Sequence, residues 1–528
     1  MRRTGNKRRR FLAAASVVAL GLPGGAAQAE MPRPSPPLVV FISVDAFGSD
    51  LFNRWRPYFT GGLARLADEG VVYPNAYAAH GVTETCAGHA TMITGAYPRR
   101  HGITANSWYD TATGEVIGCA SAPASEEAGD RAGPWRLAVS TLGDWMKEAD
   151  PASRVFSISG KHYAAAMMGG HRADGVFSYD MRGEFAAGGG DPAAPAVVEA
   201  LNRAAGRPLR PARSPSARCQ AHVRPGEETI GGELPDITDL DAVTLEGAWS
   251  LAENHQLGRN GSPDLLAISL SATDVIGHVF GASSWRMCEQ MLDLDRMLGA
   301  FLDRLEAAEL QAVIVLTADH GQSDTPDVLV AQGYPATYIT TILTDLNSEM
   351  RSRFNLDHPP VVTGTGPHSP QGDAIQLYAV GPDERALAEP LRTQVLAAAL
   401  DWLKARPEVR TAFTADELAS PPAPDVPDEM SILDRMALSH APARSGDIMV
   451  VYQPYTTMLV AMPGRIAASH GSPYDYDRRI PLIFWSSDLN PDHRHLPVSQ
   501  VDVAPTLADR MSLSIDTMLD GRVLPVWP

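Results

Sequence analysis

Carboxylate and imidazole side chains follow several apolar runs of this sequence, and they are its clearest sign of chemistry. In chain order these side chains are Asp45 after residues 38–44, Asp274 after residues 265–270, and Asp319 with His320 after residues 312–317. Short apolar runs rich in β-branched residues are typical of buried strands in a parallel sheet. Open α/β sheets bind ligands at the carboxyl ends of such strands. We therefore expect these side chains to meet at one edge of a sheet.

Two further histidines extend this set. His278 lies four residues after Asp274, so one face of a helix can present both side chains. His470 follows another apolar run, at residues 458–462. Mixed carboxylate and imidazole ligands suit zinc, whereas manganese or iron is less favoured by this ligand chemistry. The set therefore predicts a zinc site.

Two other Asp-His pairs, at residues 357–358 and 492–493, do not directly follow an apolar run. Their flanks are rich in proline or polar residues, which is typical of solvated loops. We do not expect either pair to bind metal. We expect His89 and His101 to have structural roles rather than to act as ligands.

A candidate nucleophile, Thr85, lies in the segment GVTETCAGHA at residues 81–90. A threonine hydroxyl is a poor nucleophile at neutral pH, but coordination to a cation favours its alkoxide, just as it lowers the pKa of bound water to about 7. We expect a helix to begin near Thr85 and to run through Ile93. The amino end of a helix favours an anion. Two cations and an activated oxygen are the parts that phosphate-ester hydrolysis needs.

Together these motifs resemble the alkaline phosphatase superfamily. The motifs are VDAF at 44–47, TCAGHATMITGAYPRRHGITANSWYD at 85–110, SATDVIGH at 271–278, TADHG at 317–321 and ASHGS at 468–472. The nearest branch is the type I phosphodiesterase/nucleotide pyrophosphatase family, and within it the bacterial alkaline phosphatases with a threonine nucleophile. The resemblance runs in order from about residue 37 to about residue 525.

The resemblance implies two zinc ions and a covalent intermediate. One zinc would be held by Asp274, His278 and His470. The other would be held by Asp45, Thr85, Asp319 and His320. Thr85 would attack phosphorus, and water would then hydrolyse the phospho-threonine. Asn106 matches the asparagine that donates its amide hydrogen to a nonbridging phosphate oxygen.

The sequence departs from the phosphomonoesterase pattern at residues 161–163. Those enzymes carry Lys-x-Arg there, and both side chains reach the phosphoryl oxygens. Here Lys161 is retained, but Tyr163 stands in place of the arginine. We expect an extended segment that directs Lys161 and Tyr163 toward the site and turns His162 away. A phenol donates one neutral hydrogen bond where a guanidinium offers a charged fork, so selection of monoester dianions over diester monoanions should weaken.

We therefore expect a phosphomonoesterase of the alkaline phosphatase type, with small phosphate esters as substrates. A phosphodiesterase or nucleotide pyrophosphatase is the alternative that Tyr163 favours. A metal-binding protein without activity is less favoured, because the nucleophile and all the ligand positions are filled. A sulfatase is disfavoured because Cys86 lacks the proline and arginine of the sulfatase CxPxR signal.

The first 29 residues have the features of an export signal. Six basic residues precede an apolar stretch at residues 11–22, and an AxA cleavage site follows at residues 27–29. We expect a periplasmic or secreted protein. The segment 8–12 is also similar to a twin-arginine motif, so both twin-arginine and Sec export remain open. No later apolar run reaches the roughly 18 residues that a stable membrane span needs.

Charge and cysteine content restrict the partners. The formal net charge of the 528 residues is −18, and removal of a signal with six positive and no negative charges makes it −24. Such an acidic surface argues against a nucleic-acid polymer as partner. The four cysteines are Cys86, Cys119, Cys219 and Cys288, and they allow three complete pairings. The sequence does not decide the oligomeric state, and we take a monomer as the working expectation.

The predicted fold class is α/β, with a doubly wound, mostly parallel central sheet and helices on both faces, as in alkaline phosphatases. Expected helices at residues 61–69, 139–149, 242–255, 285–308 and 390–405 alternate with the expected strands. With 44% hydrophobic residues, residues 30–528 can form one α/β domain with a large core. Irregular insertions are expected near residues 205–236, 346–373 and 414–430, where the resemblance implies a cap over the metals.

Overall fold

The computed structural model describes residues 35–123, 132–180, 182–188, 194–224, 234–367, 375–419, 426–458, 468–515 and 517–527. Residues 35–528 group into one compact unit. The expected export signal at residues 1–29 lies outside the described residues, as does most of the apolar run at 458–462.

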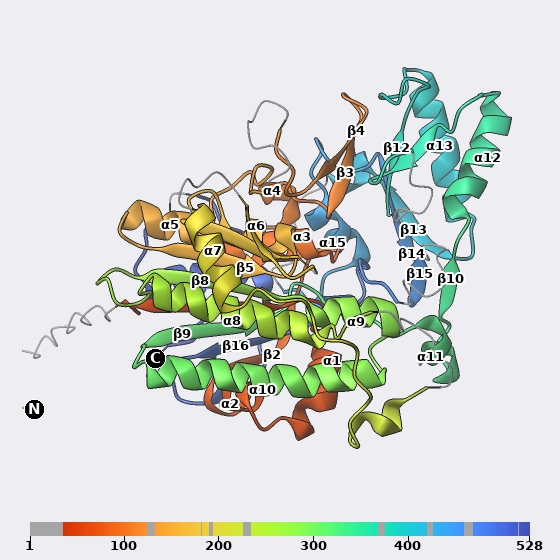
Figure 1. Cartoon of the computed structure of the whole chain (residues 1–528). Coiled ribbons are helices and arrows are strands. Elements are labelled where there is room, and N and C mark those ends of the chain that lie inside the picture. The colour runs from red at the N-terminus through yellow and green to blue at the C-terminus, as the bar shows by residue number, and fades with distance from the viewer. Residues whose placement is uncertain are drawn as a thin grey trace, which may run out of the picture. The chain divides into compact units, whose positions relative to one another are not determined.

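A large, mostly parallel sheet organises the molecule (Figure 1). Its strands, in spatial order, are β17 (Asp492–His493), β2 (Val71–Tyr77), β16 (Arg479–Trp485), β9 (Ala312–Thr317), β1 (Leu38–Val44), β8 (Asp264–Leu270), β5 (Val155–Ser159), β6 (Gly175–Tyr179) and β7 (Phe185–Gly188). A further short strand, β18 (Val498–Ser499), pairs with β2. β16 runs antiparallel to both its neighbours, β7 is antiparallel to β6, and the other pairs are parallel.

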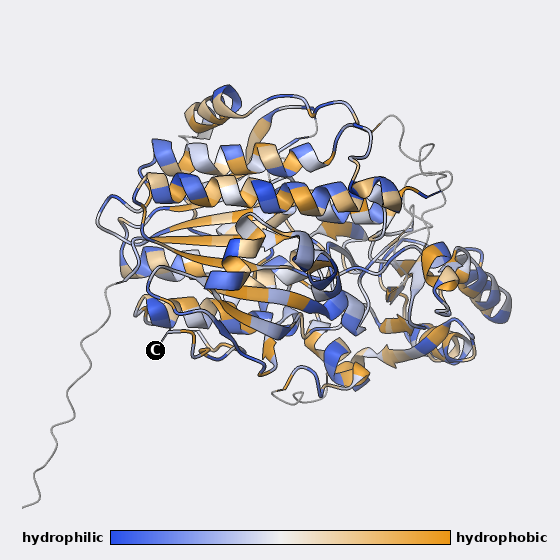
Figure 2. Cartoon of the chain, turned by 90° about the horizontal axis from the view of Figure 1, so that it is seen from below, coloured by the Kyte–Doolittle hydropathy of each residue, from blue (hydrophilic) through white to orange (hydrophobic). Residues whose placement is uncertain are grey.

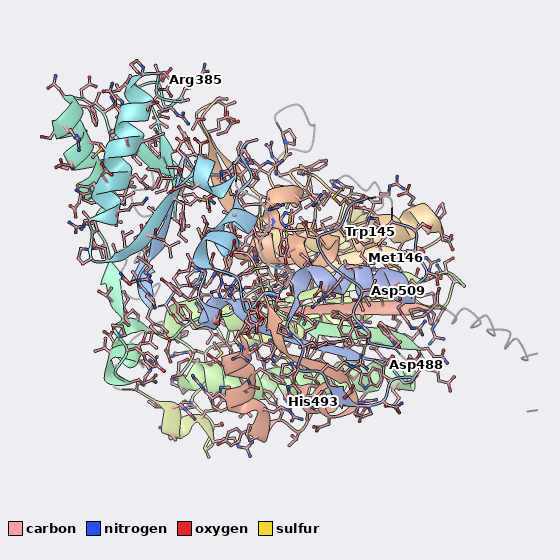
Figure 3. All side chains as sticks on the ribbon, turned by 180° about the vertical axis from the view of Figure 1, so that it is seen from behind. Trp145, Met146, Arg385, Asp488, His493 and Asp509 are labelled. Carbon is pink, nitrogen blue, oxygen red and sulfur yellow. A yellow bond between two sulfur atoms is a disulfide. The ribbon has the colours of Figure 1, made fainter. Side chains whose placement is uncertain are left out.

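Helices cover both faces of this sheet, so the expected α/β fold is confirmed. One face carries α1 (Ser49–Trp55), α2 (Gly62–Glu69), α8 (Thr238–Asn254) and α10 (Trp285–Ala307). The other carries α3 (Thr85–Thr94), α5 (Leu142–Ala149), α6 (His162–Gly169) and α17 (Val503–Arg510). α5 packs against α17, where Trp145, Met146 and Asp509 lie close together (Figure 3).

The three central strands, β1, β8 and β9, are buried along their whole length. Figure 2 shows that strands of the central sheet are largely hydrophobic, whereas the helices packed on the sheet alternate between hydrophobic and hydrophilic residues. A strand buried on both faces has no polar side to alternate with, which explains the continuous apolar runs in the sequence.

A second, smaller core lies beside the main sheet. Its antiparallel sheet has the order β11 (Val361–Thr363), β12 (Gln376–Ala379), β14 (Ile448–Tyr452) and β13 (Val409–Thr414). Its two longer helices are α12 (Ile342–Phe354) and α13 (Leu391–Lys404). Two small paired sheets are the hairpin of β3 (Ser107–Asp110) with β4 (Glu115–Gly118), and β10 (Thr337–Ile339) with β15 (Thr456–Met458).

The remaining helical elements are short. They are α4 (Pro98–His101), α7 (Ala194–Ala204), α9 (Ala272–Phe280), α11 (Pro326–Ala331), α14 (Ala415–Leu418), α15 (Ile432–Ser439), α16 (Asp475–Arg478), and 3-10 turns at Arg56–Tyr58, Cys219–His222 and Gln500–Asp502. Within the described parts of the chain, no helix combines the length and the apolar character needed to span a bilayer.

The five expected helices are present as α2, α5, α8, α10 and α13, with ends shifted by up to four residues. The expectation of irregular structure at residues 346–373 is wrong for residues 346–354 and 361–363, which belong to α12 and β11. The only buried apolar side chains of α12 are Ile342, Leu346 and Met350, a spacing that a mostly polar sequence conceals. The segment expected to be irregular at 414–430 also contains α14.

The structure pairs the four cysteines as Cys86 with Cys119 and Cys219 with Cys288. This is one of the three pairings left open by the sequence. The first disulfide joins α3 to the end of the β3–β4 hairpin, and the second ties the 3-10 turn Cys219–His222 to α10.

One buried carboxylate fixes the start of α2 against α10. Asp295 accepts hydrogen bonds from the backbone N–H groups of Thr60 and Gly61, both at 2.7 Å, and of Ala64 at 3.1 Å. These groups belong to the first turn of a helix, which lacks partners within the helix itself. A side chain at Gly62 would meet the backbone nitrogen of Gly299 at 2.4 Å, so the two helices are in direct contact.

We predict that Asp295→Ala lowers the free energy of unfolding by about 1–3 kcal/mol, because it removes three charge-assisted hydrogen bonds. Urea denaturation followed by circular dichroism measures the change. Asp303→Ala is the control, since this carboxylate lies on the same helix with a side chain 77% exposed, and its ion pair should contribute about 0–1 kcal/mol. Equal effects of the two substitutions would contradict the assignment.

Candidate active site

The ends of β1, β8 and β9 bring the predicted carboxylates together. β1 lies between the other two strands, with Val44 beside Leu270 and Ser43 beside Thr317. Asp45 follows β1 directly, and its backbone N–H donates to the carbonyl of Leu270 at 2.9 Å. Asp274 lies in the first turn of α9, just beyond β8, and Asp319 follows β9 after one residue. All three carboxylates are buried, as adjacent parallel strands require of their common edge.

Three histidines at this edge share one orientation. The Nδ1 atoms of His278, His320 and His470 lie 2.9, 3.0 and 2.7 Å from the backbone carbonyls of Ala468, Gly321 and Thr83, respectively. A carbonyl oxygen only accepts, so each Nδ1 carries a hydrogen, and each ring in its neutral form keeps a lone pair on Nε2. An imidazole fixed in this way by a backbone carbonyl is the usual form of a metal ligand.

The Nε2 lone pairs face carboxylates. Those of His278 and His470 lie 3.3 and 3.4 Å from the same oxygen of Asp274, its Oδ1. That of His320 lies 3.4 Å from Oδ2 of Asp319. Burial lowers the pKa of His320 to about 3 and also lowers the pKa of His278, which favours their neutral forms. A lone pair and a carboxylate attract one another only through a proton or a cation between them.

Several of these buried atoms accept no hydrogen bond from the described residues. They are Oδ1 of Asp45, Oδ1 of Asp274, Oδ2 of Asp319 and Nε2 of His320. Burial, reinforced by the negative charge of Asp319, raises the pKa of Asp45 well above its usual value. Unpaired carboxylates without a cation cost several kcal/mol each, and two divalent ions would remove that cost. The donor set therefore fits a metal centre.

The ligand atoms form two overlapping groups. The first is Asp274, His278 and His470, and the second is Asp45, Asp274 and His320, with the atoms of each group within 4.8 Å of one another. The first group matches the set that the resemblance implies. The second contains Asp274 rather than Asp319, so Asp274 lies between the two positions.

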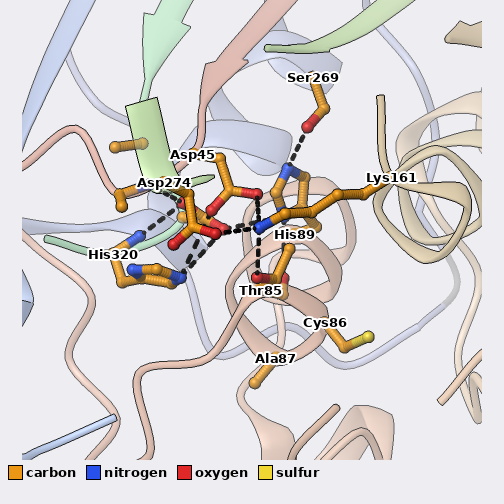
Figure 4. A network of polar contacts seen from close by, with 12 residues as sticks. Asp45, Thr85, Cys86, Ala87, His89, Lys161, Ser269, Asp274 and His320 are labelled. Atoms are coloured by element: carbon orange, nitrogen blue, oxygen red, sulfur yellow. Dashed lines mark hydrogen bonds and ion pairs between the residues drawn. The ribbon is translucent and has the colours of Figure 1, made fainter. Parts of the chain in front are cut away.

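Thr85 lies beside this centre at the first residue of α3. Its hydroxyl is 3.4 Å from Nζ of Lys161, and its side chain is buried. The same Nζ lies 2.7 Å from Oδ2 of Asp45 and 2.6 Å from Oδ2 of Asp274, so the ammonium contacts all three groups (Figure 4). Burial alone would lower the pKa of Lys161, but Asp274 and Asp45 hold it well above its usual value. Lys161 therefore remains a cation.

The expectation of an extended segment at residues 161–163 is wrong. Lys161 is the extended residue that precedes α6, and His162 and Tyr163 form the first turn of that helix. His162 is exposed, as expected, and Tyr163 is half-buried. The Tyr163 ring centroid is 6.0 Å from Nζ of Lys161, so the phenol is near the site. Burial raises the pKa of Tyr163 to about 12, and the phenol therefore stays neutral at moderate pH.

Asn106 is held by contacts to the residues on both sides of Thr85, the candidate nucleophile. Its backbone N–H donates to the carboxylate of Glu84 at 2.6 Å, and its side-chain oxygen accepts from the backbone N–H of Cys86 at 2.9 Å. Its backbone carbonyl accepts from the N–H of Cys119 at 2.9 Å. The amide nitrogen is the remaining polar atom of Asn106, and it is the atom that an oxyanion needs.

Sequence reasoning missed Glu84, which directly precedes Thr85 and is buried. Its position next to a candidate nucleophile was the available signal in the sequence, but its partner Asn106 is 22 residues away.

Of the two Asp-His pairs that were not expected to bind metal, Asp492 and His493 are exposed on the outer strand β17, away from the centre (Figure 3). Asp357 and His358 contact each other at 3.2 Å, outside both ligand groups.

Comparison with known proteins places this geometry in a family. Residues 39–472 match the model of type I phosphodiesterase / nucleotide pyrophosphatase. The chain is 37% identical over 519 residues to alkaline phosphatase PhoK of Sphingomonas sp, covering 93% of this chain and 91% of that protein. It is 35% identical over 527 residues to alkaline phosphatase PhoD of Zymomonas mobilis, covering 93% and 88%.

Solved structures show the same fold. The crystal structure of wild-type alkaline phosphatase PafA superposes with a TM-score of 0.75 at 22% identity, covering 91% of this chain and 97% of that one. Murine ectonucleotide pyrophosphatase / phosphodiesterase 5 gives a TM-score of 0.53 at 15% identity, covering 90% and 95%. The family match spans most of the chain and includes each ligand-bearing strand end, and the chain belongs to the type I phosphodiesterase / nucleotide pyrophosphatase family.

Proposed function

We propose that this chain is an exported phosphomonoesterase that uses two zinc ions and a phospho-threonine intermediate. The observation that carries the proposal is the buried hydroxyl of Thr85, which shares the Lys161 ammonium with Asp45 and Asp274. Unpaired carboxylate oxygens at the same place face the Nε2 atoms of three histidines. The relatives named alkaline phosphatases support the choice of monoesters. The sequence of residues 1–29 supports export to the periplasm or the exterior.

Zinc is favoured by the mixed imidazole and carboxylate donors. One ion would be held by Asp274, His278 and His470, and the other by Asp45, Thr85, Asp319 and His320. When bound, the two ions supply positive charge and Lewis acidity at the reacting phosphate. The three histidines are already oriented for ligation by their bonds to backbone carbonyls.

The chain's own residues account for positioning the substrate. Thr85 Oγ1 forms a bond to phosphorus while the ester P–O bond breaks and the alcohol leaves. Lys161, 3.4 Å from that hydroxyl, donates to a nonbridging oxygen, and the amide nitrogen of Asn106 donates to another. Thr85 is also at the amino end of α3, which favours the added negative charge. Water then attacks the phospho-threonine, releasing phosphate and restoring the hydroxyl.

Phosphodiester hydrolysis is the second candidate. A monoester dianion would bind best beside two cations. This site offers one ammonium, Lys161, and one neutral phenol, Tyr163. A diester carries one negative charge fewer on its phosphate, so it loses less from the missing cation.

The first experiment compares kcat/KM for 4-nitrophenyl phosphate with that for bis(4-nitrophenyl) phosphate. We expect the zinc-loaded mature protein to prefer the monoester. Thr85→Ala should reduce kcat on both substrates by about 10³-fold or more, because it removes the nucleophile. Thr85→Ser, which keeps a hydroxyl, is the matched control. Full activity of Thr85→Ala would refute the covalent mechanism, and a diester preference would move the assignment to phosphodiesterase.

We predict two tightly bound metal ions per chain and fewer than two in Asp274→Ala, because Asp274 belongs to both ligand groups. Removal of metal by a chelator should abolish turnover, and zinc should restore it. Elemental analysis of the purified protein measures the stoichiometry. Asp357→Ala is the control, since this carboxylate is 98% exposed in another Asp-His pair and should retain two ions. An unchanged metal content in Asp274→Ala would exclude this centre.

Tyr163→Arg should raise the ratio of monoester to diester kcat/KM by about tenfold or more. A charged hydrogen bond contributes about 1.5–3 kcal/mol, and the monoester gains more from it. His162→Arg places the same guanidinium on the neighbouring exposed position and should leave the ratio unchanged. If both variants change the ratio equally, Tyr163 does not contact the substrate.

A further inference from the structure

One buried histidine outside the ligand set contacts three parts of the site. His89 is one turn after Thr85 on α3 and has no exposed surface. Its Nδ1 lies 2.8 Å from the backbone carbonyl of Thr85 and 3.3 Å from Oδ2 of Asp319. Its Nε2 lies 2.9 Å from the hydroxyl of Ser269 on β8, as Figure 4 shows. The ring therefore links the nucleophile's helix to two strands of the metal centre.

The neighbours of the ring fix its hydrogens. Nδ1 faces a carbonyl and a carboxylate, which both accept, so Nδ1 carries the hydrogen. It donates to the Thr85 carbonyl and presents the positive end of the N–H group to Asp319. The hydroxyl of Ser269 can donate to Nε2, so both ring nitrogens have a hydrogen-bonding partner.

Asp319 has one free oxygen next to this N–H group. Its Oδ1 accepts from the backbone N–H groups of Ala46 at 3.0 Å and His320 at 2.9 Å. Its Oδ2 accepts no hydrogen bond from any described residue and lies 3.4 Å from Nε2 of His320. Oδ2 is therefore the atom available to a metal ion, and His89 is the polar side chain at its other side.

The helix and the strand end are in close contact at this point. A Cβ added to Gly88 would lie 2.4 Å from the backbone oxygen of Asp319. The same oxygen accepts a hydrogen bond from Gln500 at 2.6 Å. Gly88 thus permits the approach, and His89 contacts both Thr85 and Asp319 at this point.

We infer that His89 is a positioning residue that fixes Thr85 relative to Oδ2 of Asp319 through its Nδ1–H group, and so tunes the affinity of the metal site. The inference rests on the proposed function, because it takes Asp319 to be a metal ligand. Partners of metal-ligating side chains typically change metal affinity or activity by about 10–100-fold when they are removed.

Two amide substitutions separate the contributions of the two ring nitrogens. In His89→Asn the amide nitrogen takes the place of Nδ1 and can still donate to the Thr85 carbonyl. In His89→Gln the amide lies nearer the place of Nε2 and reaches toward Ser269 instead. His89→Ala removes both contacts, and Ser269→Ala removes only the partner of Nε2.

The measurement is competition for zinc between the folded full-length mature protein and a chromophoric chelator, with circular dichroism as the check on folding. We expect His89→Asn and Ser269→Ala to stay within about threefold of the parent affinity. His89→Gln and His89→Ala should lose about tenfold or more. The same order should appear in the yield of phospho-threonine from a single turnover.

Two outcomes overturn the inference. One is equal metal affinity in all four variants with losses only in thermal stability, which is the behaviour of a packing residue. The other is equal loss in His89→Asn and His89→Ala, which would exclude the Nδ1–H group as the cause. If the parent protein binds no zinc, both the proposed function and the inference are refuted. If the parent protein binds zinc, the results with the four variants test the inference alone.

Discussion

The arrangement of this molecule depends on three carboxylates buried at the edge of one sheet. Asp45, Asp274 and Asp319 follow three adjacent strands, where the parallel register brings them together. Buried like charges repel one another strongly at low dielectric, so they can remain ionised together only with cations between them. The structure meets part of this demand with Lys161, which contacts two of the three. The negative charge that Lys161 leaves uncompensated makes the site suited to divalent metal ions. The positive charge of such ions is also what binding of a phosphate ester requires.

Much of this centre could be predicted because its residues follow strongly apolar runs. The bounds of β1 and β9 are those expected, and the side chains after them lie where parallel strand ends place them. The helical spacing of Asp274 and His278 was equally readable, since both lie on α9. The division of these ligands between two metal positions was harder to predict from the sequence. Asp274 belongs to both ligand groups, which only the distances between side chains reveal.

The errors have local physical causes. The segment at 161–163 was expected to continue the extended course of β5, but α6 begins at His162 without a side-chain cap or a marked apolar face to signal it. Three alanines and two methionines follow, and both residue types favour a helix. The smaller core was missed in part because α12 buries only a few apolar residues. The disulfide pairing could not be predicted at all, since it depends on which surfaces meet in space.

The first disulfide shows how the proposed phosphate donor, Asn106, can be held without a rigid secondary structure. Asn106 precedes the β3–β4 hairpin, where a loop would normally be mobile. Its backbone and side-chain oxygen are bound by Glu84, Cys86 and Cys119, and the bond between the two cysteines closes that loop onto the first turn of α3. Thr85, the proposed nucleophile, and Asn106 are thereby tied to the same short segment. Such a linkage persists in an oxidising compartment, so the expected export signal and the construction of the site are consistent with one another.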